Sequence, residues 1–326
     1  MQQFLASFSS SFLLALLVWP FLAAALTLPI LIWQYRRYNK FSFWRAIMTY
    51  GFVLYGLALV SFTLYPMPDN PAKFCADYNL SPQLIPFASI MEISSEGLRA
   101  ALQVGMNLLF FVPLGIFGKL LFRWKIWKVV LAGFVTSLLI ETAQLTGAFG
   151  IYPCSYRLFD VDDLLLNTLG AILGYLVAMI VPQRELTLAT KNDVVRQAGL
   201  LRYGVAFVID QATVVVSSIL AILILYLLIG SDLPQDTAKW LTIIFEIIVY
   251  MLMPLLAKGW SIGGKMVRLN HDNKQRSFWR RLLFYVARLV YILLIVALYD
   301  GKFALLVIIV TLIYWHKRKQ LPYQFI

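Results

Sequence analysis

The polar side chains that can do chemistry in this chain gather around one short segment between two apolar runs. Residues 157–167, RLFDVDDLLLN, contain one arginine, three aspartates and one asparagine. Three of these side chains recur at spacings of three and four, which places them on one helix face: Asp160, Asp163 and Asn167. Glu141 and Gln144, three residues apart in the preceding apolar run, also share a face. Charge is costly to keep beside a bilayer, so this polarity predicts a functional cluster.

These residue types are compatible with four kinds of site. The carboxylates of Glu141, Asp160 and Asp163 are hard oxygen ligands for a divalent cation, although their spacing matches no compact metal-binding loop. A lipid or glycan headgroup fits equally, with Arg157 on a phosphate and the acids on amines or hydroxyls. Catalysis would leave acid and base work to the carboxylates alone, because neither histidine lies on these faces. The fourth interpretation is a structural network of Arg157 with the acids, helped by capping of the following helix. We predict no cofactor, with the divalent cation as the alternative.

Membrane-spanning helices must position these residues. The chain has 326 residues, of which 61% are hydrophobic and 13% charged, a composition that a soluble domain of this size does not tolerate. We therefore predict an all-α, polytopic transmembrane bundle. The apolar runs indicate about nine helices, at 11–33, 46–65, 104–122, 129–147, 164–182, 205–230, 240–257, 282–299 and 303–315. The net charge of +12 lies in short clusters between these runs, so no nucleic-acid partner is expected.

The basic residues predict the orientation of the chain. With the loop after the first helix placed in the cytoplasm, five of the 28 lysines and arginines fall outside: Lys73, Arg99, Arg157, Lys239 and Lys302. The N-terminus is then outside and the C-terminus cytoplasmic. This topology places Cys75 and Cys154, the two cysteines of the chain, in outward loops, where they form either a disulfide or two separate thiols.

A polar stretch divides the predicted spans into two modules. Residues 183–201 form a predicted cytoplasmic linker between a first module, 1–182, and a second module, 202–326. The second module carries three candidate residues for an ion or proton site: Arg202, Asp210 and Glu246. The alternative is that Asp210 pairs with a basic residue in a structural contact.

Five motifs of the first module resemble, in order, those of the VanZ-like membrane family: LYPMP at 64–68, IPF at 85–87, NLLFFVPLG at 107–115, IETAQ at 140–144 and RLFDVDDLLLNTLGAILGY at 157–175. The resemblance covers about 45–182. It implies a bundle of four to five helices in the bacterial plasma membrane, in a family whose founding member is linked to low-level teicoplanin resistance. By motif position, the residues that it implicates are Asn107, Glu141, Gln144, Arg157, Asp160, Asp163 and Asn167.

The second module resembles the RDD family of small bacterial membrane domains. The motifs are RYGVAFVID at 202–210, WSIGGKMVRL at 260–269 and SFWRR at 277–281. The resemblance covers about 198–315, and Arg202 and Asp210 match the first arginine and first aspartate of the family pattern. The later aspartate of that pattern has no counterpart here, which weakens an inference of transport.

Together these features predict a cell-envelope membrane protein that binds or handles an envelope lipid or lipid-like glycopeptide. The expected site is an outward-facing acidic pocket formed by Glu141, Arg157, Asp160 and Asp163, with Asn107 close by. The expected partners are membrane lipids and an envelope glycolipid or glycopeptide. One alternative is a metal-assisted enzyme that acts on a lipid-linked headgroup. The other is an ion or proton transporter that uses the second module.

Overall fold

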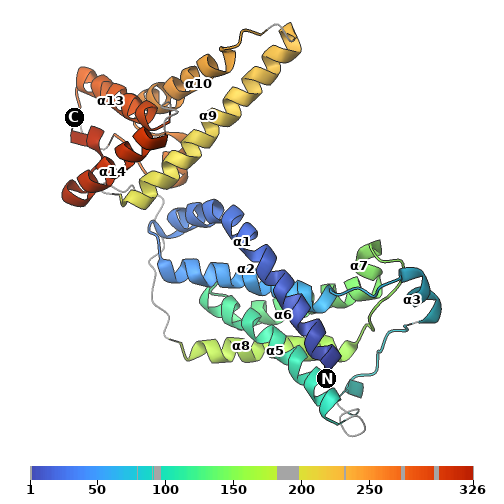
Figure 1. Ribbon diagram of the computed structural model, residues 1–326. Coiled ribbons are helices and arrows are strands. Elements are labelled where there is room, and N and C mark those ends of the chain that lie inside the picture. The colour runs from blue at the N-terminus through green and yellow to red at the C-terminus, as the bar shows by residue number, and fades with distance from the viewer. Residues whose placement is uncertain are drawn as a thin grey trace. The chain divides into compact units, whose positions relative to one another are not determined.

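The computed structural model describes residues 2–78, 80–89, 91, 97–181, 198–230, 233–272, 276–296 and 301–325. Within these ranges the regular elements are helices, and one isolated bridge joins Gln83 to Asp160, so the all-α prediction is confirmed (Figure 1). The chain forms two compact units, 1–27 with 42–185 and 28–41 with 186–326. Residues 183–197, most of the predicted linker, lie outside the described residues.

Helices occur at all nine predicted positions, but the number of spans is smaller. Seven helices in the described part of the chain are long and apolar enough to cross a membrane: Leu13–Tyr38, Phe43–Leu64, Ala100–Leu120, Ile126–Leu145, Val161–Met179, Leu200–Ile229 and Thr237–Leu256. The last two predicted spans correspond to α13 (Phe278–Val296) and α14 (Gly301–Arg318). Each contains three lysine or arginine residues, and neither is among the seven candidate spans.

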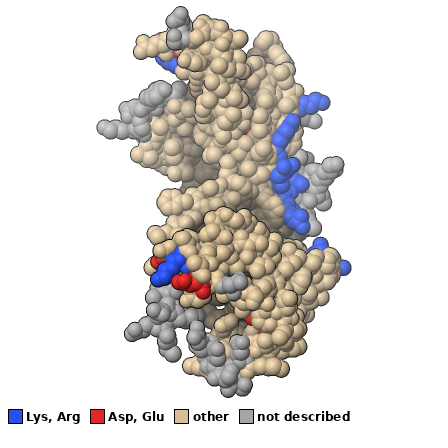
Figure 2. Space-filling model, turned by 90° about the vertical axis from the view of Figure 1, so that its right-hand side faces the viewer, with Lys and Arg blue, Asp and Glu red and all other residues tan. Residues whose placement is uncertain are grey.

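The surface agrees with a protein surrounded by lipid. In Figure 2, lysine, arginine and acidic side chains form small patches, and most of the described surface on that face carries neither. Large apolar side chains are exposed along the helices, among them Leu17, Ile180 and Leu227. Their exposure would be unfavourable in water and is the expected state in hydrocarbon.

Unit 1 is a helical bundle built around α8. It contains α2 (Phe43–Leu64), α5 (Leu98–Leu120), α6 (Ile126–Leu145), α8 (Val161–Met179) and the first part of α1 (Gln2–Tyr38). The short helices α3 (Pro71–Asp77) and α7 (Gly147–Gly150) lie in the connections (Figure 1).

Glycines bring α5 and α8 into backbone contact. A Cβ atom added at Gly170 would lie 2.1 Å from the carbonyl oxygen of Leu108, and one at Gly174 would lie 1.9 Å from that of Val112. On α5, a Cβ at Gly115 would meet the backbone of α8 equally closely. The glycines of α8 therefore let α5 pack against it in backbone contact.

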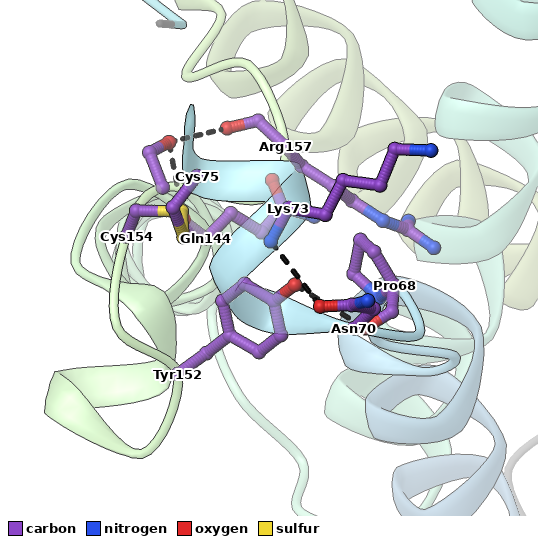
Figure 3. Close-up of a disulfide and its surroundings, with 9 residues drawn as sticks. Pro68, Asn70, Lys73, Cys75, Gln144, Tyr152, Cys154 and Arg157 are labelled. Atoms are coloured by element: carbon purple, nitrogen blue, oxygen red, sulfur yellow. Dashed lines mark hydrogen bonds between the residues drawn. A yellow bond between two sulfur atoms is a disulfide. The ribbon is translucent and has the colours of Figure 1, made fainter. Parts of the chain in front are cut away.

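A disulfide joins the connection after α2 to the connection after α7. Cys75 of α3 and Cys154 are bonded, with their Cα atoms 5.9 Å apart (Figure 3). Tyr152 packs in the same cluster, and its hydroxyl donates to the carbonyl of Pro68 at 3.2 Å. Two connections that are distant in sequence thus form one small folded region.

Unit 2 is assembled on the long helix α9 (Leu200–Ile229). Its other elements are α10 (Thr237–Ile247), the π-helix η1 (Ile248–Leu252), α11 (Met253–Leu256), α12 (Ile262–Met266), α13, α14 and η2 (Pro322–Phe325). Residues 28–41, which the predicted boundary places in the first module, belong to this unit. Tyr35 explains this assignment, because it packs in a buried cluster with Val205 and Ile209 of α9.

Candidate functional site

Three side chains from the segment around α7 hold the C-terminal end of α2. The Arg157 guanidinium donates to two backbone carbonyls, at 3.3 and 3.4 Å. The Gln144 amide donates to a third at 2.8 Å, and the Tyr156 hydroxyl to a fourth at 3.2 Å. The four acceptors are the carbonyls of residues 62–65, at a helix end where carbonyls lack the next turn as a partner. Gln144 and Arg157 therefore fix α2 to the rest of the bundle.

Arg157 interacts with the acidic cluster through its charge and not through a direct ion pair. Among the described residues, ion pairs form at Asp210 and Asp272, and Arg157 is in none of them. Its charge is close enough to Glu141 to interact with it, but its hydrogen bonds go to α2. Burial lowers the pKa of Arg157, and the nearby charges of Tyr156 and Glu141 oppose that shift. A cation at a helix C-terminus is also favoured by the helix dipole.

The acidic cluster itself lies where α5, α6 and α8 meet. Glu141 of α6 is 1% exposed, and its carboxylate accepts from the backbone N–H of Asp160 at 3.0 Å. The carboxyl groups of Glu141 and Asp163 lie close enough to interact with each other. On its other side, Asp163 accepts a short hydrogen bond from the side-chain amide of Asn107 on α5. The structure thus brings together four predicted site residues from three helices or their ends.

Asp160 and its neighbour Asp162 organise the start of α8. Asp160 is the N-cap residue, and its side chain accepts from the N–H of Asp162 at 2.8 Å and from the hydroxyl of Ser89 at 2.9 Å. Asp162 accepts from the N–H groups of Phe87 and Ser89, at 2.6 and 2.8 Å. These contacts tie the loop before α5 to the start of α8. Capping, the simpler interpretation of the sequence, therefore accounts for Asp160.

A second polar layer lies below the acids. The Asn167 amide donates to the Ser137 hydroxyl at 2.8 Å, and that hydroxyl donates to the backbone carbonyl of Asp163 at 3.2 Å. Sequence reasoning missed Ser137, although it precedes Glu141 by four residues and so shares its helix face. Ser137 and Asn167 support the backbone that carries Asp163.

The predicted pocket takes the form of a cluster that is mostly buried. Glu141, Asp160 and Asn167 are buried, whereas Asn107 and Asp163 are partly exposed and form the accessible edge. Two carboxyl groups in contact repel each other unless a proton or a positively charged group lies between them. The chemistry open to this edge is acceptance of hydrogen bonds from a donor-bearing or cationic group.

Metal binding by the three predicted carboxylates has little support in this geometry. The described residues contain no group of three or more His, Cys, Asp or Glu side chains placed to hold a metal ion. Both carboxylate oxygens of Asp160 already accept hydrogen bonds, one from Asp162 and one from Ser89. A ligand to a cation would have to give up these contacts.

In unit 2, the structure does not bring Arg202 to Asp210. Arg202 donates to the side-chain oxygen of Asn39 at 2.8 Å and to the Asn39 carbonyl, and it stacks on the ring of Tyr35 at 4.5 Å. It is therefore an anchor between α9 and the segment after α1. No sequence spacing indicated this partner, because Asn39 lies 163 residues away.

Asp210 and Glu246 have separate partners. Asp210 accepts from the N–H of Gly263 at 2.7 Å, and one of its oxygens lies 3.8 Å from the Arg288 guanidinium. This is the structural pairing with a basic residue that the sequence left as an alternative. Glu246 accepts from the side-chain amide of Gln211 at 2.6 Å.

Ser261 and His271 lie near Arg288 but do not form a nucleophilic pair. Their side chains are 3.3 Å apart and both are buried. The His271 Nε2 atom also lies 3.1 Å from the guanidinium of Arg288, which can only donate. Burial and the Arg288 charge lower the pKa of His271 well below its ordinary value. A neutral histidine whose acceptor nitrogen is occupied serves as a structural contact.

Part of the chain matches a known protein family. Residues 52–182 match the model of the VanZ/LLP1 family. No curated protein and no solved structure matches the chain. The matched segment runs from α2 through α8, so it contains the acidic cluster, the disulfide and the contacts at the end of α2. The RDD resemblance of the second unit stays a prediction. The chain is therefore a multi-pass membrane protein that carries a VanZ-like domain at residues 52–182.

Proposed function

We propose that the VanZ-like domain binds the headgroup of an envelope lipid or lipid-like glycopeptide through hydrogen-bond donors of that headgroup. The observation that carries the proposal is the carboxyl pair of Glu141 and Asp163, which has no ion pair with any cation in the described residues. An ammonium group or a cluster of hydroxyls at the partly exposed Asp163 would supply the missing donors. Asn107 would orient the Asp163 carboxylate toward that headgroup.

The contacts of Arg157 decide which headgroup chemistry this proposal favours. Two of the five N–H donors of Arg157 are given to the carbonyls at the end of α2, so a phosphate on Arg157 would have to bind to the remaining three. Cations and hydroxyls are the better match, because the accessible edge consists of a carboxylate and an amide that is already bonded to it. The proposed ligand is therefore an amphiphile with an amine or sugar headgroup.

Neither the enzyme alternative nor the transport alternative gains a supporting contact from the described residues. The enzyme alternative needs a cation among the acids, and the oxygens of Asp160 are occupied by hydrogen bonds. The transport alternative needs Asp210 to be available to an ion, and it is fully buried between Gly263 and Arg288. These contacts support a structural role for Asp210.

Binding of defined amphiphiles tests the proposal. The full chain in lipid nanodiscs is titrated with a fluorescent long-chain ammonium amphiphile and with a glycolipid of equal chain length. Asp163→Asn keeps the shape of the side chain and removes its charge, so we expect a loss of ammonium affinity of about tenfold or more. Asp77→Asn, at an exposed acid in α3, is the matched control and should bind as the unmodified chain does. Equal ammonium affinity in the two variants would contradict the proposal.

A further inference from the structure

An apolar groove runs between α2 and α5 in the VanZ-like domain. It has a volume of about 270 Å³. Its lining consists of Tyr55, Ala58, Leu59, Phe62, Leu109, Phe110, Val112 and Pro113. Both helices are long and apolar enough to span a membrane. The medium around the groove is therefore hydrocarbon, and a chain of methylene groups is the occupant that its walls match.

Two aromatic side chains of the groove lining lie near polar residues of the domain. Phe62 and Phe110 stack with their ring centroids 5.3 Å apart. The carbonyl of Phe62 accepts from Arg157, and Phe110 follows Asn107 by three residues and so shares its helix face. Along α5, Asn107, whose amide donates to Asp163, precedes the lining residues Leu109 and Phe110 by less than one turn.

The α5 backbone beside the groove has a carbonyl that lacks its usual helical donor. Pro113 lies inside α5 and has no N–H to donate to the carbonyl of Leu109, four residues earlier. Leu109 and Pro113 both line the groove. Leu109 is two residues from Asn107, a rise of about 3 Å along the helix. An amide or hydroxyl at the junction of a headgroup and its chain would lie at this level.

We propose that the groove binds the hydrocarbon chain of the same amphiphile whose headgroup lies against Asp163 and Asn107. The inference rests on the proposed function and adds to it that the ligand must carry a long chain. A lipid anchored by headgroup and chain together would bind more tightly as its chain lengthens, until the groove is filled. Bulk lipid makes no contact with the acids, so its occupancy of the groove would not depend on its headgroup.

The test separates chain recognition from headgroup recognition. The full chain in nanodiscs is titrated with ammonium amphiphiles that differ only in chain length, and with neutral amphiphiles of the same lengths. Ala58→Phe fills the groove from α2. Val60→Phe adds the same ring at an exposed α2 position outside the lining and serves as the matched control. We expect Ala58→Phe to lower the affinity of the longest amphiphile about tenfold or more, to that of the shortest. It should keep the preference for ammonium over neutral headgroups.

The remaining variants give the outcomes that decide the inference. Leu109→Trp fills the groove from an exposed α5 position, and it replaces Ala58→Phe if that variant does not fold. Affinity for long chains that stays unchanged in a folded groove variant would overturn the inference. The inference would also be overturned if cross-linking detected a dimer of the unmodified chain that Ala58→Phe abolishes. The groove would then hold a second copy of the chain. Asp163→Asn could keep the preference for ammonium while Ala58→Phe removes the dependence of affinity on chain length. The proposed headgroup site would then be wrong, and the inference that one ligand occupies both the headgroup site and the groove would fail with it.

Discussion

At the scale of single residues, the polar side chains of the VanZ-like domain form two groups with different roles. Gln144, Tyr156 and Arg157 satisfy the carbonyls at the end of α2. Glu141 and Asp163 form a carboxyl pair that makes no direct ion pair with a cation among the described residues. A substitution in the first group should change stability, and one in the second should change binding.

Substitution of Arg157 tests whether the first group acts on stability and not on binding. Arg157→Met removes two hydrogen bonds from a charged donor to backbone carbonyls, so we expect the free energy of unfolding to fall by about 1–3 kcal/mol. Affinity for an ammonium amphiphile should not fall, because the charge that is removed lies near Glu141 and repels a cation. Thermal unfolding in detergent and the binding titration measure the two effects, with Lys73→Met, at an exposed site in α3, as control. Reduced affinity at unchanged stability would instead make Arg157 a ligand contact.

His271 should give unit 2 a pH dependence. Burial, followed by the Arg288 charge, lowers its pKa well below 6.5, so the unfolded chain takes up the proton first as the pH falls. The stability contributed by neutral His271 is fully present above about pH 6.5 and is lost as the pH falls toward the lowered value. Thermal unfolding of His271→Gln should show a smaller loss between neutral and acidic pH than the unmodified chain. His316→Gln, at an exposed position, should show the same dependence of stability on pH as the unmodified chain. Equal pH dependence of stability in all three proteins would disprove the role of His271.

At the scale of elements, the site depends on how closely α5 and α8 approach, because Asn107 and Asp163 come from these two helices. Glycines at the contact allow the backbones to touch. The same two helices also receive the loop before α5 through Asp162. The headgroup site is therefore a consequence of helix packing.

A single methyl group tests this packing. Gly174→Ala places a Cβ 1.9 Å from the Val112 carbonyl, so α5 and α8 must separate, at a cost of about 1–3 kcal/mol in unfolding free energy. Ammonium binding should weaken as well, because separation moves Asn107 from Asp163. Gly56→Ala on α2, where nothing lies within 4 Å, is the matched control and should leave both measurements unchanged. Unaltered stability of Gly174→Ala would show that the helices adjust without cost.

At the scale of the whole molecule, the predicted orientation places the disulfide and the acidic cluster toward the outside of the cell. The unequal distribution of lysines and arginines motivates this prediction. Cys75 and Cys154 join two connections at that end of unit 1. A disulfide is the expected state of two cysteines in an oxidising compartment.

Labelling in intact cells measures the orientation. In Cys75→Ser the remaining Cys154 thiol should react with a membrane-impermeant reagent without lysis. Reporters near Asn79 and Lys191, two positions outside the described residues, should be external and cytoplasmic respectively. Reaction of Cys154 only after lysis would reverse the topology and place the proposed headgroup site on the cytoplasmic side.

The amino-acid sequence by itself determined the all-α class, the positions of the helices and the polar faces within each helix. Helical hydrogen bonds are local, so spacings of three and four place Asp160, Asp163 and Asn167 on one stripe whatever surrounds them. Gly170 and Gly174 continue the same stripe, and small residues on a membrane helix indicate that another helix packs closely there. The VanZ-like motifs located the same segment that the family model matches.

Only the tertiary structure decided which partners these faces meet. Arg157 donates to carbonyls about 90 residues away, and Asp210 pairs with Arg288 from another helix. Every residue has a backbone carbonyl, so the sequence does not mark which carbonyls accept a hydrogen bond from Arg157. The acceptors at the end of α2 could therefore not be predicted. Long-range contacts depend on how several helices pack together, which no local periodicity contains. For the same reason the groove between α2 and α5 became visible only when both helices were in place.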